Sequence, residues 1–177
     1  MHMMKSAFFL AIATITLVLS TDSHTEAAPA TAATIPTGKT IALVSSSRFG
    51  LFLSGGGGVE TVGVVAFTNI PIWSAPKAGT LRAGFIESVN FERNMAKKYV
   101  QITGRFHRRT YGFSKHDQGR QYDWRSLPGA KCAGYPYFVQ FFEPNEQVYC
   151  VRCCTHKQDC PTNRPTRGCR EVIPGKY

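Results

Sequence analysis

Short hydrophobic runs separated by Gly, Pro and Asn recur along the chain from residue 59 onward. Such runs are typical of β-strands joined by turns. The runs are VETVGVVAF (59–67), FIESVNF (85–91), YVQIT (99–103), YFVQFF (137–142) and QVYCV (147–151). No window of a dozen residues in this part of the sequence has the 3.6-residue period of an amphipathic helix. The pattern therefore predicts an all-β fold, a single antiparallel β-barrel or sandwich.

The segment FIESVNF alternates, which predicts a strand with two distinct faces. One predicted face holds Phe85, Glu87, Val89 and Phe91, and the other holds Ile86, Ser88 and Asn90. The run TIALV (40–44) predicts a shorter strand, and SGGGG (54–58) predicts a flexible loop. The Pro- and Gly-containing pieces 70–80 and 126–136 are typical of turns.

The first apolar run has a different character. Ala7 to Leu19 is uncharged and follows Lys5. It is shorter than the roughly 20 residues of a membrane-spanning helix, and it fits the core of a secretory signal peptide cleaved after Ser20 or after Ala27. The predicted organisation is a signal peptide (1–27), an Ala/Thr/Pro leader with a Gly-rich linker (28–58) and a cysteine-rich β domain (59–177). The predicted location is extracellular.

All six cysteines lie in the C-terminal part of the chain. They are Cys132, Cys150, Cys153, Cys154, Cys160 and Cys169. An even number in a secreted chain predicts three disulfides that staple the C-terminal segment. The neighbours Cys153 and Cys154 are expected to reach two different partners. The competing interpretations are a catalytic thiol and a zinc site made of Cys150, Cys153, His156 and Cys160, and the oxidising secretory route disfavours both.

Basic residues are concentrated in the middle of the chain. The formal net charge is +10, and it becomes +11 without the first 27 residues, which contain Lys5, Asp22 and Glu26. A basic surface attracts polyanions such as acidic polysaccharide, nucleic acid or anionic lipid heads, although it can also be only a solvated surface. The predicted binding residues are Arg105, His107, Arg108, Arg109, Lys115, Arg120, Arg125 and, as a stacking partner, Trp124.

Two enzymatic interpretations compete with binding. A ribonuclease needs an acid, a base and a cation at the phosphate, and His107, His116 and Glu92 are the candidate residues. A glycosidase needs two converging carboxyl groups, but Asp117 before Gln118–Gly119 is more typical of an Asx turn. A third alternative is a purely structural cell-wall protein. No residue pattern calls for a cofactor or a metal.

An ordered set of motifs also resembles a known group of proteins. The motifs are YVQITGR (99–105), DQGRQYD (117–123), GAKCAGYPYFVQFFEP (129–144), YCVRCC (149–154) and GCREVIPGKY (168–177). In this order they resemble fungal secreted cysteine-rich proteins, some of which carry the label macrophage-activating glycoprotein. The resemblance implies an extracellular, cysteine-rich protein of fungal origin, without catalytic residues that could be transferred. His116, Arg120 and Trp124 depart from the group, whose members often have a glycine-rich, acidic segment there.

The even number of cysteines leads to a first prediction. Because all six cysteines are expected to be paired, thiol titration of the denatured, unreduced protein should find no free thiol. The same titration after reduction provides the control, since it should then find all six. Two or more reactive thiols before reduction would contradict the disulfide interpretation.

Overall fold

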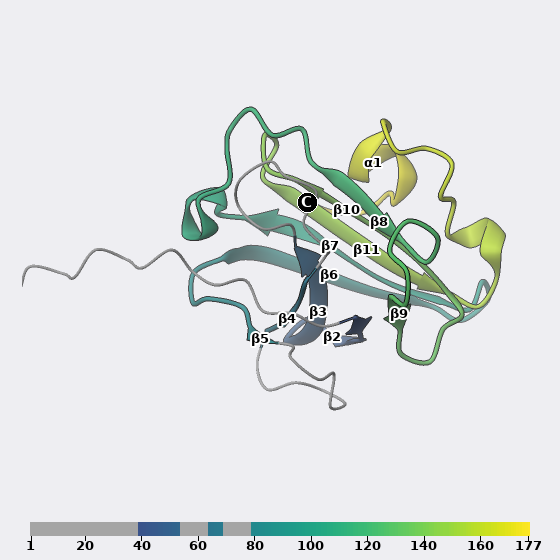
Figure 1. The fold of residues 1–177 in the computed structure, drawn as a ribbon. Helices are drawn as coiled ribbons and strands as arrows, with labels where there is room; N and C mark the ends of the chain where they lie inside the picture. Colours follow the sequence, from purple (N-terminus) through teal and green to yellow (C-terminus); the bar gives the residue numbers. More distant parts are fainter. Residues whose placement is uncertain (1–38, 54–63, 69–78) are drawn as a thin grey trace, which may run out of the picture. The chain divides into compact units, whose positions relative to one another are not determined.

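The computed structural model describes residues 39–53, 64–68 and 79–177 (Figure 1). The predicted signal peptide, the glycine run 54–58 and most of the predicted turn 70–80 lie outside these residues. Within them the chain is mostly β-strand, so the all-β prediction is confirmed. The described strands form separate sheets and do not close into a barrel.

The largest sheet has five antiparallel strands in the order β6-β7-β11-β10-β8. The strands are β6 (Ile86–Asn94), β7 (Tyr99–Phe106), β8 (Arg120–Asp123), β10 (Tyr137–Glu143) and β11 (Val148–Cys154). Four of them contain hydrophobic runs that predict strands. Strand β8 is short and polar, and it lies at one edge of the sheet.

The N-terminal strands form smaller sheets. A four-stranded sheet contains β2 (Leu43–Ser45), β3 (Arg48–Leu53), β4 (Val64–Phe67) and β5 (Gly79–Thr80). Strand β1 (Thr40–Ile41) pairs in parallel with β9 (Lys131–Cys132). Phe49, Leu51, Phe52 and Leu53 of β3 are fully buried. Buried residues of β1, β2 and β3, which precede the domain boundary predicted at residue 59, belong to the same cluster as residues of the later strands.

The two faces of the large sheet carry two separate clusters of buried residues. On the first face Ile102, Phe138 and Val151 belong to the same cluster as Ile41 and Phe52 of the N-terminal strands. On the second face the residues that follow β11 cover the sheet. Val172 of the short helix α1 (Gly168–Val172) belongs to the buried cluster on this face. The 3-10 turn η2 (Lys157–Asp159) precedes that helix in the chain.

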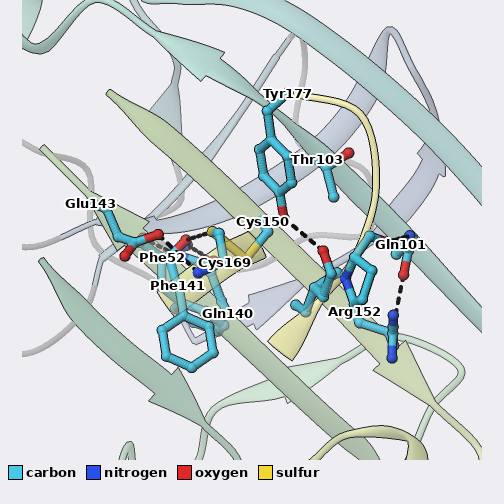
Figure 2. The surroundings of a disulfide bond; sticks show 12 residues. Phe52, Gln101, Thr103, Gln140, Phe141, Glu143, Cys150, Arg152, Cys169 and Tyr177 are labelled. Atoms are coloured by element: carbon cyan, nitrogen blue, oxygen red, sulfur yellow. Dashed lines mark hydrogen bonds between the residues drawn. A yellow bond between two sulfur atoms is a disulfide. The ribbon is translucent and has the colours of Figure 1, made fainter. Parts of the chain in front are cut away.

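Strand β11 anchors disulfides on both faces, because consecutive side chains of a strand point in opposite directions. Cys153 bonds to Cys132 within the first cluster. Cys154 bonds to Cys160 within the second. Cys150 bonds to Cys169, which completes three disulfides and leaves no free cysteine (Figure 2). The prediction of three disulfides is confirmed, including separate partners for the two adjacent cysteines.

Hydrogen bonds hold the C-terminal segment along the second face. The Cys169 N–H donates to the Glu143 carboxylate at 2.8 Å, and burial raises the pKa of that carboxyl. Further along, the Gln101 side-chain amide donates to the Pro174 carbonyl at 3.0 Å. The Tyr177 hydroxyl donates back to the Ile173 carbonyl at 2.6 Å (Figure 2). These bonds and the disulfides make the segment an integral layer of the fold.

One predicted alternation is wrong at a single residue. In β6, Ile86 pairs with Phe106 and Ser88 pairs with Arg105, so Glu87 is an extra residue opposite β7. Such a β-bulge shifts the residues before it to the other face. Ile86 therefore packs with Val89 against the first cluster rather than with Ser88. The alternation of the segment after the bulge agrees with the prediction.

The buried amide of Gln140 joins the two sheets. Its side chain is fully buried on β10. The Phe52 N–H donates to Gln140 Oε1 at 2.9 Å, and Gln140 Nε2 donates to the Phe52 carbonyl. The side chain of Gln140 in the five-stranded sheet thus satisfies the backbone N–H and carbonyl of Phe52 in the four-stranded sheet. The glutamine also satisfies its own polar atoms, which is what a buried amide requires.

Replacement of this amide is expected to destabilise the protein strongly. Gln140→Leu keeps a similar volume but leaves the Phe52 N–H and carbonyl buried without these partners. At about 1–3 kcal/mol for each of these two groups, the free energy of unfolding should fall by about 2–6 kcal/mol in denaturant titration. Gln158→Leu is the control, because Gln158 is exposed and its replacement should change stability little. Equal effects of the two variants would contradict this role of Gln140.

Candidate functional site

The predicted basic loop is a crossover between two strands of the large sheet. Strand β7 ends at Phe106 and β8 begins at Arg120, and β11 and β10 lie between them. Residues 107–119, the crossover loop, therefore pass over one end of the sheet. The β10–β11 turn holds this loop, since the Arg108 N–H donates to Gln147 Oε1 at 3.3 Å and the Asn145 N–H donates to the Asp117 carbonyl at 2.9 Å.

Five of the predicted residues lie on the crossover loop. They are His107, Arg108, Arg109, Lys115 and His116, of which all but the half-buried Arg108 are exposed. A single 3-10 turn, η1 (Arg108–Tyr111), orders the first part of the loop. None of these five side chains forms an ion pair with another described residue.

Arg105 differs from the other predicted binding residues. Its Nε lies 3.6 Å from a carboxylate oxygen of Glu87, the bulged residue of β6. Both side chains are partly exposed, so the pair contributes little to stability. The pairing nevertheless partly neutralises Arg105, which leaves this arginine less available to a ligand than the others.

A tight turn places Arg120 at the start of β8. The Gly119 N–H donates to Asp117 Oδ1 at 2.9 Å, so the Asx turn predicted at Asp117 is confirmed. Gly119 has a φ of +91°, and an added Cβ would overlap the carbonyl oxygen of Phe142. Only glycine satisfies both conditions. The turn thus brings the backbone at Gly119 into close contact with β10, and it places Arg120 at the free edge of the sheet.

Arg120 and Arg125 line an open hollow at this edge, which we call the edge groove. Its volume is about 660 Å³. The lining residues are Gly119, Arg120, Gln121, Asp123, Arg125, Ser126, Thr162 and Pro165. The last two come from the disulfide-bonded segment after β11. The groove is thus built by β8 and its following turn on one side and by the stapled tail on the other.

Among the described residues that line the edge groove, Asp123 alone is acidic, and its side chain is buried. The side chain is 2% exposed. Its Oδ1 accepts the N–H groups of Arg125 and Ser126, each at 2.7 Å, and its Oδ2 accepts Gln121 Nε2 at 2.5 Å. Three donors therefore compensate the carboxylate. Asp123 shapes the turn that carries Arg125, and its carboxylate oxygens are occupied by these hydrogen bonds.

Next to the groove, two cations lie over the indole ring of Trp124. The Arg125 guanidinium carbon is 5.9 Å from the ring centroid, and Lys157 Nζ is 5.6 Å from it. Tyr137 meets the same ring edge-on at 5.4 Å. We call these four residues the Trp124 cluster. Because the side chains of Arg125 and Lys157 approach the indole, Trp124 holds cations in place rather than offering a bare ring for stacking.

Lys157 is the functional candidate that sequence reasoning missed. It lies in η2 between Cys154 and Cys160, a stretch whose cysteines indicate only a structural staple. The Cys154–Cys160 disulfide holds this turn on the second face of the sheet, where Tyr137 also packs. No local pattern points to this contact, since it depends on the fold of two distant segments.

The proposed ribonuclease residues are not brought together. Glu92 pairs with Gln101 on β7, six residues before His107, which at about 3.3 Å per residue is roughly 20 Å along the strand. Its carboxylate instead accepts the Tyr99 hydroxyl at 3.1 Å and Gln101 Nε2 at 3.0 Å. Gln101 in turn accepts from Arg152, whose pKa burial lowers. Glu92 belongs to a polar network that supports the sheet.

The described residues contain no cluster of His, Cys, Asp and Glu side chains suited to a metal ion. The alternative zinc set is not available, because Cys150, Cys153 and Cys160 are each in a disulfide. None of the described helices has the length and apolar character that crossing a bilayer requires.

Comparisons with protein-family models, with curated proteins and with solved structures find no match to this chain.

The groove depends on Asp123, which gives a further prediction. In Asp123→Asn the new amide N–H₂ faces the Gln121 N–H₂, so two donors meet and one hydrogen bond is lost. The free energy of unfolding should fall by about 1–3 kcal/mol, measured by denaturant titration. Asp117→Asn is the matched control, because asparagine also forms an Asx turn and should leave stability nearly unchanged. A larger loss in the control than in Asp123→Asn would contradict this assignment.

Proposed function

We propose that this chain is a secreted, non-catalytic protein that binds an acidic polysaccharide at the cell wall or at a host surface through the edge groove and the Trp124 cluster. The observation that carries the proposal is that Arg120 and Arg125 line one groove, while Lys157 shares the Trp124 ring with Arg125. Among the described lining residues only Asp123 is acidic, and its carboxylate is hydrogen-bonded within the turn. A cationic groove without an exposed acid is complementary to a chain of negative charges.

The shape of the groove favours an extended ligand over a small one. The groove is open and lies at a sheet edge, where a polymer can run past without entering a closed cavity. Further cations on the crossover loop, including His107 in its protonated form, Arg109 and Lys115, are exposed and add long-range attraction. Binding of this kind is dominated by charge and weakens as salt increases.

Secretion is part of the proposal and has independent support. The apolar run after Lys5 has the length of a signal peptide core. Three disulfides are compatible with an oxidising, extracellular location. The motif order that resembles fungal secreted cysteine-rich proteins supports the same location and a fungal origin.

The proposal is tested by retention on immobilised acidic polysaccharide such as heparin. Wild type should be retained at low salt and released as salt rises. Arg120→Gln/Arg125→Gln should bind about tenfold more weakly, at roughly 0.7 kcal/mol for each exposed ionic contact. Lys97→Gln/Lys98→Gln removes the same charge from the exposed β6–β7 turn and should lose less. Equal losses in the two double variants, or no retention of wild type, would overturn the proposal.

The role of Trp124 can be separated from that of net charge. Trp124→Leu leaves the charge unchanged but removes the ring that positions Arg125 and Lys157. Its affinity for the polysaccharide should fall, and Trp124→Phe should retain more of the affinity because phenylalanine still offers an aromatic face. If both variants bind as wild type does, the Trp124 cluster has no role in binding.

A further inference from the structure

A second hollow, distant in sequence from the edge groove, combines apolar walls with two arginines. We call it the arginine pocket. Its volume is about 520 Å³, within the range of about 300–1,000 Å³ that is typical of small-molecule sites. The lining residues are Leu43, Val44, Arg48, Arg93, Ala133, Gly134 and Tyr135. None of them is acidic, and none of them lines the edge groove.

Three separate segments build the arginine pocket, and each is fixed by the fold. In the β2–β3 hairpin the register shifts between Leu43 and Ser45, and this bulge lets the consecutive residues Leu43 and Val44 line the same hollow. The loop after β9 is held by the Cys132–Cys153 disulfide and by the Ala133 N–H, which donates to the Ile41 carbonyl at 2.8 Å. The walls are therefore preformed.

The polarity of the pocket indicates the chemistry of its ligand. Leu43 is 6% exposed, and Val44, Ala133 and Tyr135 pack against the first buried cluster, so the walls are continuous with the core. Arg48 and Arg93 are exposed and form no ion pair with another described residue. A ligand that matches both the apolar walls and the two arginines has an apolar body and an anionic head.

The neighbouring acid does not neutralise the pocket. Glu92 precedes Arg93 on β6, but consecutive strand residues point to opposite faces. Arg93 pairs with Val100, on the face of the first cluster. Glu92 is hydrogen-bonded to Tyr99 and Gln101 on the other face. The guanidinium groups of the pocket therefore keep their charge for an external anion.

We propose that the arginine pocket binds a small amphipathic carboxylate, with its apolar chain against Leu43, Val44 and Tyr135 and its carboxylate at Arg48 and Arg93. A charge-assisted bond from a guanidinium to a carboxylate is stronger than a neutral hydrogen bond. The apolar walls favour a hydrocarbon chain over a bare anion such as chloride or phosphate. This site does not depend on the proposed polysaccharide function, because the two hollows share no lining residue.

The test is calorimetric titration of the oxidised full chain with octanoate, using 1-octanol as the neutral analogue and acetate as the anion without a chain. Octanoate should bind saturably at one site, and the two analogues should bind much more weakly. Arg93→Gln and Arg48→Gln should each weaken octanoate binding about tenfold, the effect of losing a hydrogen bond to a charged group. Arg93→Lys, which keeps the charge, should lose less than Arg93→Gln.

Two control variants separate this proposal from the previous one. Arg109→Gln removes one charge from the crossover loop and should leave octanoate binding unchanged. Arg120→Gln/Arg125→Gln should lose polysaccharide retention but keep octanoate binding. The arginine pocket is ruled out as the site if octanoate does not bind saturably, if octanol binds as tightly, or if only the groove variant loses octanoate.

Discussion

The alternation of side chains along β11 is the constraint on which both halves of the fold depend. Because neighbouring residues of a strand point to opposite faces, Cys153 enters one buried cluster and Cys154 enters the other. One strand in the middle of the sheet thereby anchors the loop before β10 through Cys132 and the tail through Cys160. A shift of β11 by one residue would exchange the two faces and misplace every partner.

Both candidate sites depend on these anchors. The tail that supplies Lys157 and Thr162 to the neighbourhood of the edge groove is held by Cys154 and Cys150. The loop that supplies Ala133 and Tyr135 to the arginine pocket is held by Cys132. The cysteine cluster therefore has no reactive role of its own, yet it places the segments that complete each hollow. The two candidate sites and the stability of the fold therefore depend on the same covalent bonds.

Much of the strand pattern could be predicted from the sequence, because β-branched and aromatic runs between Gly and Pro have a local cause. The pairing of all six cysteines was also predictable from their number and the predicted compartment. The bulges at Glu87 and Val44 were not predictable, since each depends on the pairing register with the neighbouring strand. Nor was the bond from Gln140 to Phe52, which joins residues far apart in the chain and explains why β3 belongs to the core.

The candidate site, too, could be predicted only in part from the sequence. The excess of positive charge is a property of composition, and its attraction for anions follows from the sequence alone. Its distribution required the fold, which pairs Arg105 with Glu87 and adds Lys157 from the tail. Trp124 was predicted as a stacking surface, whereas its contacts with Arg125 and Lys157 make it a support for cations.

The disulfides of the tail also determine what happens when the backbone there is cut. Arg167 is exposed, lies between Cys160 and Cys169 and precedes Gly168, so a trypsin-like protease can cleave after it. Cleavage after Arg167 leaves the C-terminal fragment covalently attached through Cys169 to Cys150 in the centre of the sheet. Its hydrogen bonds to Glu143 and Gln101 can then persist. A nicked molecule would keep its second face covered and remain one covalently connected chain.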